Sequence, residues 1–520
     1  MLYRLTRVST SSAAPTGRTA SALRGQVPCR RLLATSPDGD GIGALKAELK
    51  AAEDRVATLK EAIVSHKDPA KKSILVLGAG RSSSFLINYL LQNAARERWA
   101  VKVGDEDEHT ARRKVRDHPD GTAFRFNIND TRQREEEIRR ADVVVSLLPA
   151  FMHPVVAAEC VKQGAHMVTA SYSAALAPFD EQARRAGVTI LMECGLDPGI
   201  DHMSAMEVID AIKRDGGQLT AFRSYTGGLV APESDDNPWG YKFSWNPRNV
   251  VVAGQGVCQY LQQGEYKYVP YHQLFRRTDE IRVPGHGTFE GYPNRDSLSY
   301  RTIYGIPDCP TVLRGTLRKP GYCSAWNVFV QLGMTDDTYT IENADSLTYR
   351  DFLNSFLPYR PHDTVELKLA HYLGLDINSP EMQKIKWLGM FGEQKISLKS
   401  ATPAQVLQQI LEKKWALQEG EKDMIVMYHH FVYTNKNGEL KETKSSLVVK
   451  GDGTDTGTAM AKTVGLPLAV ATRMVATEQV KGKTGVHVPT TPDLYEPILR
   501  ELEKDHGIIF SHQHDTVHQA

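Results

Sequence analysis

Residues 73–83 read SILVLGAGRSS, an apolar run that ends in a glycine-rich turn. Gly78 and Gly80 stand where a dinucleotide-binding fold needs glycine: the first allows a tight turn, and the second lets the backbone approach a pyrophosphate at the next helix's N-terminus. Ser83 takes the third position of this pattern, and its hydroxyl is suited to bind a phosphate oxygen. A glycine pair alone is weak evidence, so the neighbouring segments decide whether the turn belongs to such a fold.

The residues after this turn alternate between two kinds of pattern. Apolar runs that predict strands are separated by segments that predict helices, which is typical of right-handed crossovers and a parallel sheet. Strands are expected at 73–80, 99–105, 122–128, 142–149 and 166–172, and helices at 83–95, 134–141 and 153–164. We therefore predict an α/β chain whose first domain is of the Rossmann type. A Rossmann domain that binds no nucleotide is the alternative.

The rest of the chain shows other patterns. From about residue 218 to 330, long strands, Gly/Pro loops and aromatic residues predict a mixed sheet, and short helices are expected within 345–420. A β-hairpin is expected at 421–450, and residues 459–475 predict a helix interrupted at Gly465 and Pro467. The tail, residues 506–520, carries histidines whose spacing fits no metal site, which favours disorder.

The N-terminal segment differs in composition from the body. Residues 1–36 hold six arginines, many Ser and Thr, and no acidic residue, which is typical of a mitochondrial transit peptide. A disordered basic tail is the alternative. Residues 43–66 predict a helix, and a linker completes the segment 43–72.

Composition excludes several classes of protein. Without the leader, the chain's 63 basic residues fall to 57 against 62 acidic ones, which argues against a nucleic-acid binder. No apolar run reaches the length of a membrane span. The six cysteines include no CxxC pair, so no metal site is expected. Their scattered positions favour a reducing compartment.

The residue at the end of the second strand is expected to determine which nicotinamide cofactor binds. Asp105 stands there, and a carboxylate at this position binds the ribose 2′-hydroxyl and repels a 2′-phosphate, which favours NAD over NADP. Arg112 and Arg113 follow and could bind a phosphate, so NADP is the alternative. Asn127 ends the third strand, where it could contact adenine, and Leu148 ends the fourth, beneath the nicotinamide.

Three loops have the residues of a site for an anionic substrate. ECGLDPGIDHM at 193–203 follows a strand, where ligands of α/β sheets bind, and contains Cys194, Asp197, Asp201 and His202. FEGYPNRDS at 289–297 and LRGTLRKPGY at 313–322 add arginines, which form bidentate pairs with carboxylates. Several arginines near one cleft indicate a substrate with several carboxylates. Each of these residues alone could instead form a structural salt bridge, turn or cap.

The chain as a whole resembles a known family. The stretches SLLPAFMHPVVA, MVTASY, GLDPGIDHMSAMEVID, YTGGLVAPESDDNP, YKFSWNP, EGYPNRDS, LRGTLRKPGY, WLGMFGE, EKDMIVM and AMAKTVGLP occur in order. They resemble the L-glutamate-forming saccharopine dehydrogenases and the C-terminal half of the bifunctional aminoadipic semialdehyde synthases. The resemblance covers about residues 74–505.

This resemblance implies an architecture and a reaction. The architecture is a Rossmann domain at 73–196 that residues 451–505 complete, a saccharopine-binding domain at 197–334 and 421–450, and a helical insertion at 335–420. Saccharopine, NAD(P)⁺ and water would give L-glutamate, 2-aminoadipate 6-semialdehyde and NAD(P)H, in lysine metabolism. The mitochondrial matrix is the expected location, and a homodimer is left open.

The resemblance also implies a set of site residues. Asp197 would hold the amine or its water, with Cys194, His202 and Tyr172 as weaker candidates for proton transfer. The implied substrate contacts are Ser171, Tyr172, Asp197, Arg295, Thr316, Leu317 and Arg318. The implied cofactor contacts are Gly78, Gly80, Arg81, Ser82, Ser83, Asp105, Asn127, Leu148 and Asp197. An opine-type or carboxynorspermidine-type dehydrogenase is one alternative, and a non-catalytic Rossmann scaffold is another.

Overall fold

The computed structural model describes residues 50–52, 71–172 and 174–517. The chain divides into two compact units, residues 1–66 and 67–520. Of the first unit only residues 50–52 are described, and they are helical. The expected leader at 1–36 and most of the expected helix at 43–66 therefore lie outside the described residues. All other described residues belong to the second unit.

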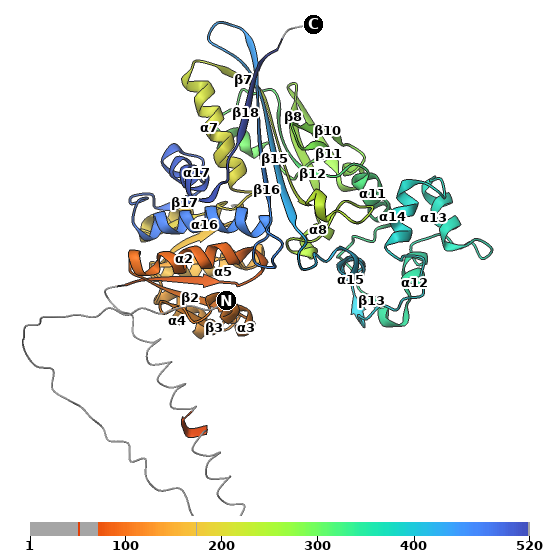
Figure 1. Cartoon of the computed structure of the whole chain (residues 1–520), viewed down its shortest axis with the longest axis horizontal. Helices are drawn as coiled ribbons and strands as arrows, with labels where there is room; N and C mark the ends of the chain where they lie inside the picture. Colours follow the sequence, from red (N-terminus) through yellow and green to blue (C-terminus); the bar gives the residue numbers. More distant parts are fainter. Residues whose placement is uncertain (1–49, 53–70, 173, 518–520) are drawn as a thin grey trace, which may run out of the picture. The chain divides into compact units, whose positions relative to one another are not determined.

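A seven-stranded parallel sheet forms the nucleotide-binding part (Figure 1). Its order is β17-β6-β5-β4-β1-β2-β3, so the direction of winding changes beside β1, between β1 and β4. Residues near the C-terminus supply the outer strand, where Gly485 pairs with Thr189. The strands are β1 Lys72–Leu77, β2 Trp99–Asp105, β3 Gly121–Arg125, β4 Val143–Ser146, β5 His166–Thr169, β6 Thr189–Leu191 and β17 Gly485–His487. The predicted parallel α/β sheet is confirmed.

Helices cover both faces of this sheet, which explains why Ile74–Leu77 of β1 are apolar without a break. Ile74 and Val76 pack in one core with α2 and α16, whereas Leu75 and Leu77 pack in another with α5 and α6. The helices of this part are α2 Ser84–Glu97, α3 Glu108–Val115, α4 Thr131–Arg139, α5 His153–Gln163, α6 Asp180–Ala186, α16 Ala459–Ala476 and α17 Pro492–His506.

A mixed sheet forms the second part. Its main order is β10-β11-β12-β7-β15-β16-β18, and β8 joins β12 to β9. β7 and β12 run parallel, while β15 and β16 form the predicted hairpin. The strands are β7 Gln218–Val230, β8 Val257–Gln262, β9 Glu265–Pro270, β10 Asp279–Val283, β11 Gly287–Pro293, β12 Val312–Arg318, β15 Asp423–Thr434, β16 Leu440–Lys450 and β18 Ser511–Thr516. α7, Ile200–Arg214, leads from the first sheet into β7.

A helical segment separates β12 from β15. The short helices expected within 345–420 are present, and one of them, α14, has Ser379 as its N-cap. The remaining elements are α8 Pro247–Val251, α9 Tyr271–Leu274, α10 Ser299–Ile303, α11 Tyr322–Leu332, β13 Ile341–Glu342, α12 Tyr349–Asn354, α13 Val365–Leu373, α14 Pro380–Trp387, β14 Ser400–Ala401 and α15 Pro403–Trp415.

Helix α16 corrects one expectation, because it continues through Gly465 and Pro467. Gly465 sits against α2: a Cβ there would lie 2.9 Å from the backbone nitrogen of Leu86. The glycine thus permits close helix packing and does not end the helix. Thr463 donates its hydroxyl to the carbonyl of Ala459, four residues earlier. Tertiary packing therefore outweighs the local preference of these residues against helix.

The tail corrects another expectation. Ser511–Thr516 form β18 and pair with β16, the edge strand of the hairpin. His512 and His514 bond the hydroxyls of Ser445 and Thr443 on that strand. An uncovered sheet edge binds a neighbouring extended chain, which explains order in a polar segment that has no core of its own.

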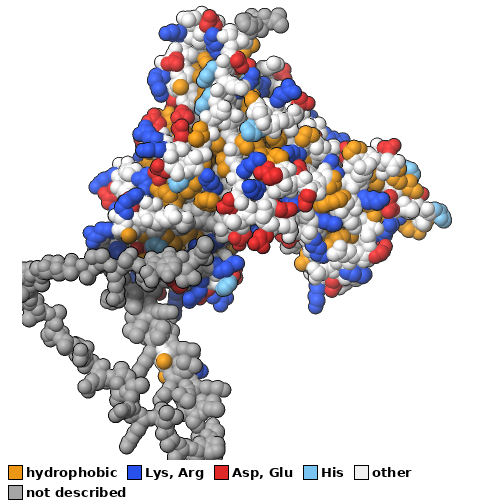
Figure 2. All heavy atoms as spheres, viewed as in Figure 1, with side chains coloured by type: hydrophobic (Ala, Val, Ile, Leu, Met, Phe, Trp, Pro, Cys, Tyr) orange, Lys and Arg blue, Asp and Glu red, His pale blue; other side chains and the backbone are white. Residues whose placement is uncertain are grey.

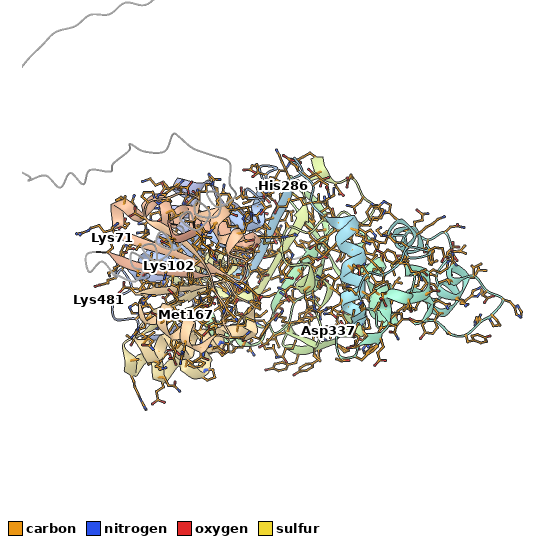
Figure 3. The ribbon with its side chains drawn as sticks, turned by 90° about the horizontal axis from the view of Figure 1, so that it is seen from below. Lys71, Lys102, Met167, His286, Asp337 and Lys481 are labelled. Atoms are coloured by element: carbon orange, nitrogen blue, oxygen red, sulfur yellow. The ribbon has the colours of Figure 1, made fainter. Side chains whose placement is uncertain are left out.

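The two parts of the unit can be followed in the other views. In Figure 3, Lys102 on β2 and Met167 on β5 mark the parallel sheet, while His286 and Asp337 lie toward the mixed sheet and helical segment. Figure 2 shows Lys and Arg side chains scattered among Asp and Glu on the face that it draws. In the described part of the chain, no helix is both long and apolar enough to cross a membrane. Within the same residues, no cluster of His, Cys, Asp and Glu suits a metal ion.

Candidate functional site

The glycine-rich turn has the shape that a dinucleotide phosphate needs. Gly78 has φ +100°, and a Cβ there would lie 3.1 Å from the carbonyl oxygen of Leu147. A Cβ at Gly80 would meet nothing within 4 Å, so this backbone is open to a ligand. The 3₁₀ turn η1, Arg81–Ser83, then leads into α2. The turn and helix start therefore fit the pyrophosphate of a dinucleotide.

Asp105 lies at the end of β2 and holds this turn in place. Its Oδ2 accepts the backbone N–H of Ala79 at 2.6 Å, and its Oδ1 accepts that of Asp107 at 3.0 Å. The expected ribose ligand is thus also a brace for the turn. Glu106 and Asp107 are exposed beside it, which makes this end of the cleft acidic.

A lysine that the sequence did not single out lies on the same turn. Lys114 donates from Nζ to the Ser83 hydroxyl at 2.8 Å and also to the carbonyl of Gly80. Burial lowers the pKa of Lys114 to about 8. The Ser83 hydroxyl itself donates to the Gly80 carbonyl at 2.8 Å, so it braces the turn. Arg112, expected near a phosphate, instead pairs with Glu108 on the exposed face of α3.

The other expected cofactor residues lie at the same edge of the sheet. Asn127 is exposed just after β3, and its Oδ1 accepts the N–H of Asn129. Leu148 follows β4 and is half-buried. Because carboxyl ends of parallel strands meet at one edge, the turn after β1 and the residues after β2, β3 and β4 border one crevice.

Three predicted substrate residues come together at Asp197. The Tyr172 hydroxyl donates to Asp197 Oδ1 at 2.8 Å. Arg314 donates from one nitrogen to Asp197 Oδ1 at 2.8 Å and to Asp201 Oδ2 at 2.5 Å. The guanidinium carbons of Arg295 and Arg314 lie 5.3 and 5.8 Å from the centre of the Tyr172 ring. The loops at 171–172, 195–201 and 295 and strand β12 thus form one cluster.

The charges in this cluster are unequal. Burial and the neighbouring carboxylate of Asp201 raise the pKa of Asp197. Burial also acts to raise the pKa of Asp201, but His202 and Arg314 outweigh it and hold that pKa below its usual range. The pKa values of the two carboxylates that share Arg314 are therefore shifted in opposite directions, and Asp197 is the better proton acceptor of the two.

A buried polar layer lies behind this cluster. His202 contacts Glu193 Oε2 at 2.7 Å through Nε2 and the Tyr304 hydroxyl at 2.5 Å through Nδ1. Tyr300 stacks on His202 and lies under the guanidinium of Arg314, 4.2 Å away. The sequence offered His202 but missed Glu193 and both tyrosines. Glu193 lies in the same stretch as His202, whereas Tyr300 and Tyr304 belong to α10 and its C-cap, so no local motif unites all four.

Arg318 lies on the same strand as Arg314 but in a different environment. It is 4% exposed, and its guanidinium carbon lies 5.1, 5.8 and 5.3 Å from the rings of Tyr241, Tyr292 and Tyr322. Its Nε is buried without a hydrogen-bond partner, and no carboxylate of the described residues pairs with it. A buried charge without an anion is costly, so this position suits a ligand carboxylate.

The remaining predicted residues differ in their exposure. Thr316 is half-buried and lies between Arg314 and Arg318 in the alternation of β12. Leu317 points to the opposite face, where its fully buried side chain joins the core, so only its backbone could contact a ligand. Arg295 is exposed and has φ +51°. Asp296 caps the next turn through the N–H of Leu298 and does not pair with Arg295.

Cys194 and Ser171 have contrasting positions near β5 and β6. The Cys194 thiol is fully buried, donates to the carbonyl of Met192 at 3.3 Å, and has its pKa raised well above the usual range by burial. This environment does not support proton transfer by Cys194. Ser171 is half-buried after β5, and its hydroxyl contacts the ring of His153.

Comparisons with known proteins agree along most of the chain. The model of the saccharopine dehydrogenase NADP binding domain matches residues 74–191, and that of the saccharopine dehydrogenase C-terminal domain matches residues 195–508. The mitochondrial alpha-aminoadipic semialdehyde synthase of Bos taurus is 36% identical over 458 residues, which cover 85% of this chain and 48% of that protein. The chain thus spans about half the length of such synthases.

Relatives of similar length also match. Saccharopine dehydrogenase [NADP(+), L-glutamate-forming] of Pyricularia oryzae is 32% identical over 447 residues, covering 84% of this chain and 98% of that protein. The apo structure of saccharopine dehydrogenase (L-Glu forming) from Saccharomyces cerevisiae matches with a TM-score of 0.75 and 32% identity. It covers 85% of this chain and 100% of that chain. The chain therefore belongs to the saccharopine dehydrogenase family.

Proposed function

We propose that the chain oxidises saccharopine, with NAD(P)⁺ and water, to L-glutamate and 2-aminoadipate 6-semialdehyde. The observation that carries this proposal is the buried guanidinium of Arg318, in a chain that also has a glycine turn open to a dinucleotide. Arg318 has no carboxylate partner among the described residues, and Arg295 lies exposed over Tyr172. Saccharopine has three carboxylates and a secondary amine, which suits this arrangement. The family membership supports the same reaction.

The residues at Asp197 are suited to handle the amine. The hydrogen bonds to Asp197 from Tyr172 and Arg314 both reach Oδ1, so Oδ2 can accept an N–H from the substrate. Because its pKa is raised, Asp197 can take the proton that the secondary ammonium must lose before oxidation. A nicotinamide dinucleotide, when bound, supplies the acceptor for the hydride that leaves the carbon beside the amine.

The arginines would bind the substrate carboxylates, and the tyrosines around Arg318 would exclude water. Arg318 and Arg295 would each hold a carboxylate with two parallel hydrogen bonds. The tyrosines around Arg318 limit the access of water to its charge, which strengthens the ion pair that it forms. Water is then needed only after oxidation, to hydrolyse the imine to semialdehyde and glutamate.

The choice between the two nicotinamide cofactors has support on both sides. The family model and the names of the fungal relatives favour NADP, the alternative to the NAD that Asp105 predicts. In the structure, three successive carboxylates, at 105–107, favour NAD because they repel a 2′-phosphate. Lys114 adds one positive charge at the turn. Catalytic efficiencies with NAD and with NADP measure this preference directly.

The comparisons give no support to an opine-type enzyme, a carboxynorspermidine-type enzyme or a non-catalytic scaffold. A substrate panel tests the proposal against them. Saccharopine should be oxidised, whereas analogues that lack one glutaryl carboxylate or that carry polyamine charge should react at least tenfold less efficiently. A preference for an opine or polyamine substrate would contradict the proposal.

For the cellular location, we propose the mitochondrial matrix. The arginine-rich, acid-free segment 1–36 supports it, and mammalian relatives are named as mitochondrial. A fluorescent reporter fused to residues 1–50 should enter mitochondria, and replacement of the six arginines by glutamine should prevent import. A wild-type fusion that stays in the cytosol would refute the proposal.

A further inference from the structure

A buried histidine joins two strands beside the substrate cluster. His153 begins α5, is 2% exposed, and lies between Ser146 at the end of β4 and Ser171 after β5. Its Nδ1 lies 2.9 Å from Ser146 Oγ, and its Nε2 lies 2.6 Å from Ser171 Oγ. Burial lowers the pKa of His153 to about 4, so the ring is neutral near pH 7. A neutral ring donates from one nitrogen and accepts at the other.

The neighbouring hydroxyls decide which nitrogen carries the proton. Thr169 donates its hydroxyl to the carbonyl of Ser146 at 2.8 Å. The hydroxyl of Ser146 is fully buried and, among the described residues, has His153 Nδ1 as its partner at 2.9 Å, so it donates to Nδ1. The ring proton is then on Nε2. Thr169 Oγ1 lies 3.5 Å from Nε2 and, with its own proton already used, does not donate there.

This assignment fixes the direction of the Ser171 hydroxyl. The Nε2–H of His153 donates to Ser171 Oγ, so the Ser171 proton cannot point back at the ring. It is left to donate to another group. The adjacent residue, Tyr172, bonds Asp197 in the substrate cluster, so that group is expected in the same cleft.

We propose that His153 is a positioning residue that turns the Ser171 hydroxyl outward to donate to a carboxylate oxygen of the substrate. This inference rests on the proposed function, because it needs an anionic substrate beside Ser171. The order Ser146 to His153 to Ser171 leaves the Ser171 hydroxyl free to donate, which suits a carboxylate oxygen. His153 therefore acts on substrate affinity and does not exchange protons with the substrate.

The protein contains a matched control at another place. His429 on β15 is fully buried and lies between Ser204 Oγ at 2.8 Å and Ser224 Oγ at 2.9 Å. Burial lowers its pKa to about 4 as well. Neither of these two serines is among the predicted substrate contacts. Loss of His429 thus measures the cost of removing a buried serine–histidine–serine bridge alone.

The test compares His153→Phe, His153→Gln, Ser171→Ala and the double variant His153→Phe/Ser171→Ala with His429→Phe. His153→Phe should raise the saccharopine KM about tenfold, while kcat and cofactor KM change less than twofold. His153→Gln, which keeps a donor and an acceptor, should recover part of the loss. The double variant should be no worse than Ser171→Ala, because both changes remove one interaction. His429→Phe should lower the Tm similarly and leave the saccharopine KM within twofold.

Several results would overturn the inference. These are additive losses in the double variant, an equal rise in KM for His429→Phe, or a loss in kcat alone. If His153→Phe does not fold, Ser146→Ala replaces it: that change removes the donor to Nδ1, and the saccharopine KM should rise at least threefold. A wild-type chain that does not oxidise saccharopine would instead defeat the proposed function, which is a separate outcome.

Discussion

Arg318 and Arg314 lie on one face of β12 but differ in their ion-pair partners. Arg314 is neutralised by two carboxylates of the protein, Asp197 and Asp201, at 2.8 and 2.5 Å. Arg318 is held among tyrosine rings with no such partner in the described part of the chain. The first arginine organises the site, and the second is available to bind an anion.

Replacement of Arg318 by lysine should therefore weaken substrate binding selectively. Lysine keeps the charge but loses the two-pronged geometry, and a charge-assisted bond contributes about 1.5–3 kcal/mol. The saccharopine KM should rise about ten- to a hundredfold, while cofactor titration and Tm hardly change. Arg314→Lys is the control, because it should lower the Tm and weaken the ion pair with Asp197. An Arg318→Lys enzyme with unchanged saccharopine kinetics would remove this residue from the site.

Asp105 should control the ratio of the two cofactor activities. Asp105→Asn keeps an oxygen that can accept the N–H of Ala79, so the turn is preserved while the charge is lost. The ratio of kcat/KM for NADP to that for NAD should rise about tenfold, because the repulsion of the 2′-phosphate is weaker. Glu181→Gln, which removes an exposed charge on α6, serves as control. Equal ratios in Asp105→Asn and wild type would contradict this role.

The sequence predicted single residues best where a local motif carries the chemistry. Gly78, Gly80 and Asp105 belong to one strand–turn–helix–strand unit, and Asp105 bonds the turn between the two glycines. His153 could not be recognised, because its partners Ser146 and Ser171 are ordinary serines on two other segments. Only the parallel arrangement of β4 and β5 brings them to one ring.

Helix α16 ties the C-terminal chain to the nucleotide-binding turn. In Figure 1 it lies between α2 and α17, and Gly465 is the point where it meets α2. The backbone carbonyl of Ser82 would lie 3.2 Å from a Cβ at this glycine. The position of the cofactor turn thus depends on a helix nearly four hundred residues away in the sequence.

Gly465→Ala should consequently affect both stability and cofactor binding. A methyl group 2.9 Å from the Leu86 nitrogen forces α2 and α16 apart, and overpacking costs about 1–3 kcal/mol. We expect a lower Tm and a cofactor Kd raised several-fold, measured by fluorescence titration. Lys462→Ala, on the half-exposed side of the same helix, should change neither. A Gly465→Ala protein that is more stable than wild type would contradict the packing role.

Elements were predictable where apolar periodicity is strong and contacts are local. The bounds of β2 agree with the predicted 99–105, since the alternate apolar residues Trp99, Val101 and Val103 are buried on one face. The predicted interruption of α16 was wrong because local sequence around Gly465 and Pro467 does not reveal the α2 surface against them. β18 was missed for a similar reason: its six exposed residues gain order from the edge of β16.

The whole unit should lose stability in mild acid through its buried histidines. His153 and His429 both have a pKa of about 4, below the 6.5 of a free histidine, because burial opposes their charge. Between pH 6.5 and 4 the unfolded chain binds the proton first. As the pH falls through this window, each histidine therefore lowers the free energy of unfolding by up to about 1.4 kcal/mol per pH unit. Above pH 6.5 it has no such effect.

Unfolding at pH 7, 6 and 5 checks this expectation. The Tm should fall as the pH falls, and His429→Phe should show a flatter dependence on pH even though its Tm at pH 7 is lower. His272→Phe, which removes an exposed histidine on α9, should keep the slope of the wild type. Parallel slopes for wild type and His429→Phe would contradict the assignment of this histidine as buried and neutral.

One assay tests the proposed function of the molecule most directly. Purified chain is incubated with saccharopine and either NAD⁺ or NADP⁺, the absorbance of the reduced nicotinamide is followed, and the products are identified by mass spectrometry. We predict one L-glutamate and one 2-aminoadipate 6-semialdehyde for each reduced nicotinamide formed. Formation of lysine and 2-oxoglutarate, or no turnover with either cofactor, would contradict it.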